Sequence, residues 1–172
     1  MHVGMEVQSK RIIIEKDIND FAKISGDFNP IHIDDDYAKK SRYKKKIAHG
    51  LMSASFFSAL FGTELPGNGC VYTSQSLKFK RPIFVGDEVN TLIKIKSIDK
   101  EKRKIIFTTQ CIVKSKIVID GEAEIYIPWA WWVIKKTLIE ENTLAKGDIK
   151  DNLYVCGVPG RVFPKNYYYK YF

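Results

Sequence analysis

The strongest constraint on the fold is an almost uninterrupted apolar segment at residues 51–62, LMSASFFSALFG. It is long enough for a helix of about three turns, and its large side chains would lie on nearly every side of that helix. A helix that is apolar all round is buried, so we expect this one inside the protein. Its small residues Ser53, Ala54, Ser55 and Ser58 would let strands approach closely.

The chain after this helix is rich in β-branched and aromatic residues, which favour strands. Four such segments follow one another across short breaks, and several alternate between apolar and polar residues. They are residues 71–79, 88–98, 105–113 and 117–127. Consecutive strands joined by short links form antiparallel sheets. A buried helix followed by such a sheet predicts an α+β hot-dog fold, with the sheet wrapped around the helix.

Chemically distinctive residues are concentrated before the apolar helix, at residues 26–32 (GDFNPIH). Pro30 fixes its own backbone and restricts Asn29 to an extended conformation. Asp27 and His32 are therefore expected on a short, stiff segment without regular structure, where catalytic side chains are often found. An acid and an imidazole held in this way can share one water molecule and transfer its proton.

Three further elements are expected in this half of the chain. Arg11, Ile12, Ile13 and Ile14 favour a first strand. Residues 16–25 have the apolar spacing of a helix. The three acids at residues 34–36 precede another helix, and we interpret them as a cap that complements the helix dipole rather than as a metal site.

Several motifs carry a family resemblance. SGDFNPIH at residues 25–32 and AHGLMSASFFS at residues 48–58 resemble the MaoC-like dehydratases, and most closely the (R)-specific enoyl-CoA hydratases. The likeness continues through LPGNG at residues 65–69 and QSLKFKRPIFVGDEV at residues 75–89, and it covers residues 10–127. The resemblance implies the hot-dog fold and a hydro-lyase that adds water to a trans-2-enoyl-CoA, or removes water from the (3R)-hydroxyacyl thioester.

The resemblance also implies roles for individual residues. Asp27 and His32 match the catalytic pair, and Gly50 matches the residue whose N–H stabilises negative charge on the thioester oxygen. Among substrate-binding positions, Ser58 matches a helix serine that supports the site, and Asn29 is expected to hold the loop. The residues leave open which of the pair gives the proton; we predict Asp27 as the base and His32 as the donor.

Other candidate chemistry has less support from the residues. His49 is interpreted as a structural residue at the start of the apolar helix, although a role in the site remains an alternative. Ser53 and Ser55 have no visible base partner, which argues against nucleophilic catalysis. His32 near three acids lacks the spacing of metal ligands. We therefore expect no metal and no cofactor, coenzyme A being part of the substrate.

The chain is basic, with a formal net charge of +8. Such a charge can attract nucleic acids, anionic membranes or phosphorylated small molecules. The densest cluster includes Lys44, Lys45 and Lys46, which we interpret as the contact for the phosphates of coenzyme A; a solvated loop is the alternative. No nucleic-acid-binding motif stands beside the cluster, so no nucleic-acid partner is expected.

The three cysteines, Cys70, Cys111 and Cys156, are scattered and lack the spacing of a zinc site or a disulfide framework. Reduced thiols are typical of the cytoplasm. The sequence shows no apolar signal segment and no apolar run of membrane length. These features predict a cytoplasmic protein without a membrane span.

Pro128 marks a domain boundary. Residues 1–128 are expected to form the hydratase domain and residues 129–172 a C-terminal extension. Residues 143–162 resemble the closing segment of hexapeptide-repeat acyltransferases, but the repeated coils such enzymes stack are missing. We expect no acyltransferase activity; the extension alone motivates the hypothesis that the hydroxyacyl product supplies sugar acylation.

The leading prediction is an (R)-specific enoyl-CoA hydratase with an acyl-CoA thioester substrate. The alternatives are a dehydratase of acyl-carrier-protein substrates, a hot-dog thioesterase, and a non-catalytic acyl-CoA-binding or assembly subunit. A homodimer or larger homo-oligomer is expected because one sheet leaves open edges. The resemblance implies the same assembly, since hot-dog proteins pair two sheets edge to edge.

Overall fold

A computed structural model of the protein describes residues 1–128, 153–155 and 162–164. Contacts along the chain divide it into two compact units, Met1–Tyr126 and Ile127–Phe172. In the second unit, strand β6 (Leu153–Val155) pairs with strand β7 (Val162–Pro164) in antiparallel orientation. Most of the segment that resembles acyltransferases lies outside the described residues.

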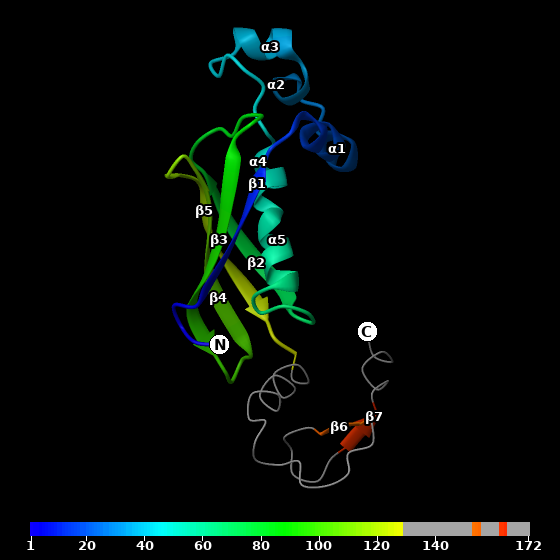
Figure 1. The fold of residues 1–172 in the computed structure, drawn as a ribbon, viewed down its shortest axis with the longest axis vertical. Coiled ribbons are helices and arrows are strands. Elements are labelled where there is room, and N and C mark those ends of the chain that lie inside the picture. The colour runs from blue at the N-terminus through cyan, green and yellow to red at the C-terminus, as the bar shows by residue number, and fades with distance from the viewer. Residues whose placement is uncertain (129–152, 156–161, 165–172) are drawn as a thin grey trace. The chain divides into compact units, whose positions relative to one another are not determined.

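The first unit is built on a five-stranded antiparallel sheet with the strand order β1-β3-β4-β5-β2 (Figure 1). The four strands expected after the helix are confirmed to within one residue at each end. The first strand begins earlier than Arg11 and ends at Ile12. The strands are β1 (Glu6–Ile12), β2 (Val71–Phe79), β3 (Glu88–Asp99), β4 (Lys104–Val113) and β5 (Lys116–Tyr126).

The sheet buries one face against the central helix, as the hot-dog prediction requires. Along β4 every second residue is buried, which is the period of a strand with one covered face. Phe107 of β4 lies edge-on against Phe61 of the helix, with ring centroids 4.9 Å apart. Figure 1 shows the helix running along the sheet. The hot-dog fold is therefore confirmed.

The central helix is present, but the expectation that it is buried all round is wrong for a single chain. It consists of α4 (Gly50–Ala54) and α5 (Phe56–Thr63), interrupted at Ser55. One side packs on the sheet through Phe57, Leu60 and other large residues. The opposite side is exposed: Leu51 is 60% accessible, and Ser58 is also at the surface.

Three shorter helices precede the central one: α1 (Glu15–Ser25), α2 (Pro30–Ile33) and α3 (Asp35–Lys40). Helix α1 ends at Gly26, which adopts the left-handed conformation that glycine tolerates. Asp34 caps α3 by accepting a hydrogen bond from the Tyr37 N–H at 2.9 Å. His32 lies in α2, so the expectation that it occupies a segment without regular structure is wrong.

Candidate active site

The loop between α1 and α2 is held by short-range hydrogen bonds. Asp27 Oδ1 accepts from the Asn29 N–H at 3.1 Å, and Asn29 Oδ1 accepts from the Ile31 N–H at 3.2 Å. Asn29 therefore caps α2 and has the loop-holding contacts predicted for it. Pro30 occupies the first turn of α2, where its missing N–H costs nothing. The Asp27 side chain remains 51% accessible and can reach a bound molecule.

His32 is half-buried, and its tautomer is determined by one contact. Its Nδ1 lies 2.7 Å from the Ile47 carbonyl oxygen. Since a carbonyl only accepts, Nδ1 carries the hydrogen and Nε2 of the neutral ring keeps a free lone pair. Burial, with a smaller contribution from His49, lowers the pKa of His32 below its usual value. His32 is therefore a neutral proton acceptor at neutral pH.

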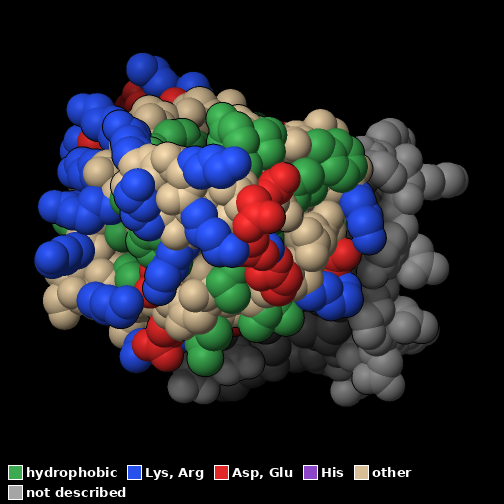
Figure 2. Space-filling view, turned by 90° about the horizontal axis from the view of Figure 1, so that it is seen from above, with side chains coloured by type: hydrophobic (Ala, Val, Ile, Leu, Met, Phe, Trp, Pro, Cys, Tyr) green, Lys and Arg blue, Asp and Glu red, His purple; other side chains and the backbone are tan. Residues whose placement is uncertain are grey.

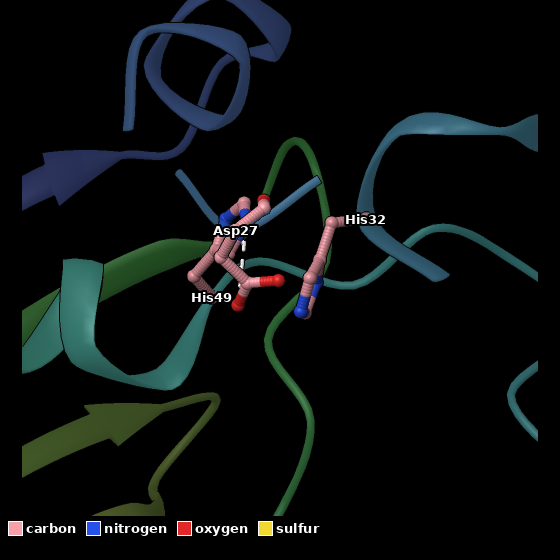
Figure 3. A group of neighbouring side chains, drawn as sticks. All are labelled: Asp27, His32 and His49. Atoms are coloured by element: carbon pink, nitrogen blue, oxygen red, sulfur yellow. Dashed lines mark hydrogen bonds and ion pairs between the residues drawn. The ribbon is translucent and has the colours of Figure 1, made fainter. Parts of the chain in front are cut away.

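His49 contacts both members of the predicted pair. It is the N-cap residue of α4, is only 2% exposed, and donates from Nε2 to the Asp27 carbonyl oxygen at 3.0 Å. Its ring stacks on the His32 ring with centroids 3.8 Å apart (Figure 3). The sequence interpretation of His49 as a structural residue missed these contacts. Its position directly before a buried apolar helix was the available signal.

Gly50 begins α4, where the first N–H groups of a helix have no partner within it. A Cβ atom added to Gly50 would lie 2.7 Å from the Phe79 ring of β2. The absence of a side chain therefore permits the close approach of Phe79. Asp27, His32 and Gly50 meet at one end of the central helix, with His49 connecting them.

Ser58 is separated from these groups. It follows Gly50 by eight residues, about 12 Å along a helix axis, and it is exposed. The predicted role of Ser58 in supporting the site stays a prediction. Ser53 lies closer in the sequence and is fully buried, and its Oγ has no hydrogen-bond partner among the described residues.

The basic cluster divides into two kinds of lysine. Lys46 is only 11% exposed and forms ion pairs with Glu15 and with Asp35, the latter at 3.2 Å. The hydrogen bond to Glu15 is the main cause that raises the Lys46 pKa. Lys44 and Lys45 form no such ion pair among the described residues, and they line a cavity of about 350 Å³ together with Lys46. Basic side chains gather over part of this end of the molecule (Figure 2).

We expect the double replacement of Lys44 and Lys45 by Ala to raise KM for a coenzyme A thioester, and more so at low salt, because exposed charges are screened by salt. The Lys46→Ala variant is measured separately, because Lys46 lines the same cavity and also joins Glu15 to Asp35: it should lower the melting temperature, which the double replacement should leave unchanged. Steady-state kinetics and thermal unfolding measure both effects. An unchanged KM at low ionic strength would identify Lys44 and Lys45 as solvated loop residues.

Asp27, His32 and His49 also form a group whose potential ligand atoms lie within 4.8 Å of one another. Each of the two imidazoles makes a hydrogen bond to a main-chain carbonyl through one ring nitrogen. Nδ1 of His32 donates to Ile47, and Nε2 of His49 donates to Asp27. The expectation of a site without a metal stays a prediction.

The structure thus defines a hot-dog protein with an acid–imidazole site at the start of its central helix, and comparisons identify its family. Residues 2–117 match the MaoC like domain. An (R)-specific enoyl-CoA hydratase from Rhodospirillum rubrum is 44% identical over 125 residues, covering 73% of this chain and 87% of that protein. A 3-hydroxybutyryl-CoA dehydratase from Methylorubrum extorquens is 38% identical over 128 residues, covering 74% and 82%.

Solved structures give the same result. The structure titled "(R)-hydratase from A. caviae involved in PHA biosynthesis" matches with a TM-score of 0.73 at 35% identity, covering 74% of this chain and 98% of that one. The chain belongs to the MaoC-like dehydratase family.

Proposed function

We propose that the protein is an (R)-specific enoyl-CoA hydratase, a hydro-lyase that interconverts a trans-2-enoyl-CoA and a (3R)-hydroxyacyl-CoA. The observation that carries this function is the meeting of Asp27, His32 and Gly50 at the start of the central helix. The 44% identity to a hydratase over most of both chains supports the same reaction. Coenzyme A enters as part of the substrate, and the reaction requires no further cofactor.

The hydrogen bond from His32 to Ile47 favours His32 as the group that takes the proton from water, whereas Asp27 is the base predicted from the sequence. His32 has its lone pair on Nε2, so it can take a proton from water as the water oxygen bonds to Cβ of the enoyl group. The resulting imidazolium can return that proton to Cα. Asp27 orients the water through its carboxylate and stabilises the imidazolium. As the water oxygen bonds to Cβ, the N–H of Gly50 would stabilise the negative charge that develops on the thioester oxygen.

The reaction is tested by incubating the protein with crotonyl-CoA and following loss of the enoyl thioester absorbance. Chiral analysis of the 3-hydroxybutyryl product should give the R form. Release of free thiol without hydration would indicate a thioesterase, and binding without turnover would indicate a non-catalytic subunit. A higher kcat/KM with crotonyl thioester on acyl carrier protein would identify the carrier protein as the preferred substrate form.

The assembly of the protein follows from its exposed edge. β2 pairs with β5 on one side, and no other described strand pairs with its second side. Phe79 on this strand and Leu51 on the helix are large apolar residues left at the surface. An open, partly apolar edge favours pairing with another chain. We therefore propose a homodimer or larger homo-oligomer, in which the acyl pocket lies near the subunit interface.

We expect light scattering at micromolar protein concentration to give a mass of at least twice that of one chain. Replacing Leu51 by Lys should shift the equilibrium toward the monomer, since burying an unpaired charge in an interface is costly. Replacing the exposed Glu101, which lies in the β3–β4 connection, by Lys is a control that adds positive charge elsewhere. A wild-type protein that remains monomeric at this concentration would contradict the proposal.

The hydration site lies within the first unit. Asp27, His32, His49 and Gly50 precede residue 60, and the sheet is complete at Tyr126. We therefore expect a chain ending at Pro128 to keep kcat within about threefold of the full-length value, well inside the 10² effect of losing a catalytic group. Activity on crotonyl-CoA and circular dichroism measure this. Complete inactivity of a folded truncated protein would place part of the site in the extension.

We propose a cytoplasmic location. Cys70 and Cys111 are free thiols in the structure, as expected for a reducing compartment. None of the helices in the described part of the chain is long and apolar enough to cross a membrane.

The hypothesis that the hydroxyacyl product supplies sugar acylation rests on the C-terminal extension. It requires a sugar acyltransferase that accepts this product.

A further inference from the structure

His49 lies behind the two residues that handle the water in the proposed hydration. It is buried and contacts both the loop that carries Asp27 and the ring of His32; Figure 3 shows the three side chains together. Phe21 of α1 covers another side of the His49 ring, with centroids 5.0 Å apart. His49 is thus held by its own packing and presents Nε2 to one member of the pair and its ring face to the other.

The hydrogen bond from His49 differs from the other hydrogen bonds of the Asp27 loop in its sequence separation. Within the described chain, the other hydrogen bonds of residues 26–29 are local: they join neighbours between Ala22 and His32. The bond from His49 Nε2 to the Asp27 carbonyl spans 22 positions and reaches a residue that is buried in the core. It therefore ties an otherwise self-contained, exposed loop to the rigid start of the central helix.

The contact with His32 is of a different kind. The two rings are stacked with an interplanar angle of 30°, so His49 limits how far the His32 ring can tilt away from the Ile47 carbonyl. His49 also excludes water from one face of that ring. Asp27 and His49 are the titratable groups that act on the charge of His32 within the described residues, and they act in opposite directions.

We propose that His49 is a positioning residue of the hydration site, which holds the Asp27 backbone and the His32 ring in the geometry needed to share one water molecule. This inference rests on the proposed function for its catalytic consequence. It assigns no proton transfer to His49, because Nε2 is engaged with a main-chain carbonyl and the ring is buried. His49 would affect the rate through geometry, because a displacement of about 1 Å between reacting groups can lower the rate 10²-fold.

Three substitutions separate the hydrogen bond from the packing. Gln places an amide N–H near the position of Nε2, so His49→Gln can keep the bond to Asp27. The amide of Asn ends near the position of Nδ1, so His49→Asn loses this bond while adding the same chemical group. His49→Phe keeps an aromatic ring against His32 and has no donor. We expect His49→Gln to keep kcat within about tenfold of wild type, and the other two to lose roughly 10²-fold with smaller changes in KM.

The acidic limb of the pH profile provides a readout that general destabilisation would not move. Burial and His49 lower the pKa of His32, so His32 stays neutral to lower pH than a free imidazole. His49→Gln and His49→Asn weaken both the burial of His32 and the effect of the His49 ring, so the pKa of His32 should rise. His32 then becomes protonated, and stops accepting protons, at a higher pH than in the wild type. The acidic limb of kcat/KM should therefore move to higher pH in both. His49→Phe keeps the burial and should move it less.

Nuclear magnetic resonance titration of the His32 ring in the same proteins measures this pKa without requiring activity. Upward shifts in His49→Gln and His49→Asn, with the expected order of kcat, would support the inference. Equal kcat in folded His49→Gln and His49→Phe, or a His32 pKa unchanged by any substitution, would overturn it, and these two proteins decide the matter even if His49→Asn fails to fold. An inactive wild-type protein would refute the proposed hydratase function instead, while the His32 titration would still decide whether His49 acts on His32.

Discussion

Asp27→Asn and His32→Ala should each lower kcat for hydration of crotonyl-CoA by 10²–10⁴-fold, the range that acid–base groups contribute. Asn retains the size of Asp and a hydrogen-bond acceptor for water, but it lacks the charge that stabilises an imidazolium. Ala removes the Nε2 lone pair that takes the proton. KM should change less, because the coenzyme A contacts are expected elsewhere. Steady-state kinetics measure both parameters.

The double variant tests whether the two residues act on the same water molecule. If they do, removing the second after the first costs little, so the double variant should be nearly as active as the poorer single variant. Circular dichroism provides the control for folding. Near wild-type kcat in both folded single variants would show that Asp27 and His32 are not the catalytic residues of hydration.

Gly50→Ala should lower kcat by about 10²–10³-fold, as expected when a donor to the developing oxyanion can no longer be reached. The new methyl group would lie 2.7 Å from the Phe79 ring. That ring belongs to a partly exposed side chain and can move, so we expect the variant to fold. Its kcat and melting temperature are the two measurements needed.

The close approach of Phe79 offers a second explanation for the same loss, and a further substitution separates the two. Phe79→Leu in the Gly50→Ala background relieves the contact with the ring while leaving the methyl group beside the Gly50 N–H that is proposed to bind the thioester oxygen. We expect melting temperature to recover and kcat to stay low. Full recovery of kcat would mean that Gly50 serves only the packing of Phe79.

The fold was predictable because its signals are local and repeated. The alternation that defines β4 and its neighbours gave strand boundaries within one residue. The central helix was also predictable, but its exposed side was not. A stretch such as Leu51 and its neighbours is apolar whether it faces the core of its own chain or a surface that another molecule covers, and composition does not separate these cases.

The candidate site was predictable only in part. The residues Asp27, His32 and Gly50 were found through a motif with set offsets, and the structure brings them to one end of the helix. The roles of His49 and Lys46 depend on contacts across 22 and 31 positions, which no local pattern encodes. The tautomer of neutral His32 was equally inaccessible, since it follows from the Ile47 carbonyl that accepts from Nδ1.

The pairing of β1 with β3 has a consequence for how fast the protein folds. Gln8 bonds to Asn90 across 82 positions, and the groups of the candidate site all lie inside the loop that this pairing closes. Non-local strand pairing slows folding, because the entropy of loop closure is lost before contacts compensate it. β5, which links β4 to β2, is synthesised last of the five strands. We expect refolding on the scale of milliseconds to seconds, with the site assembled late.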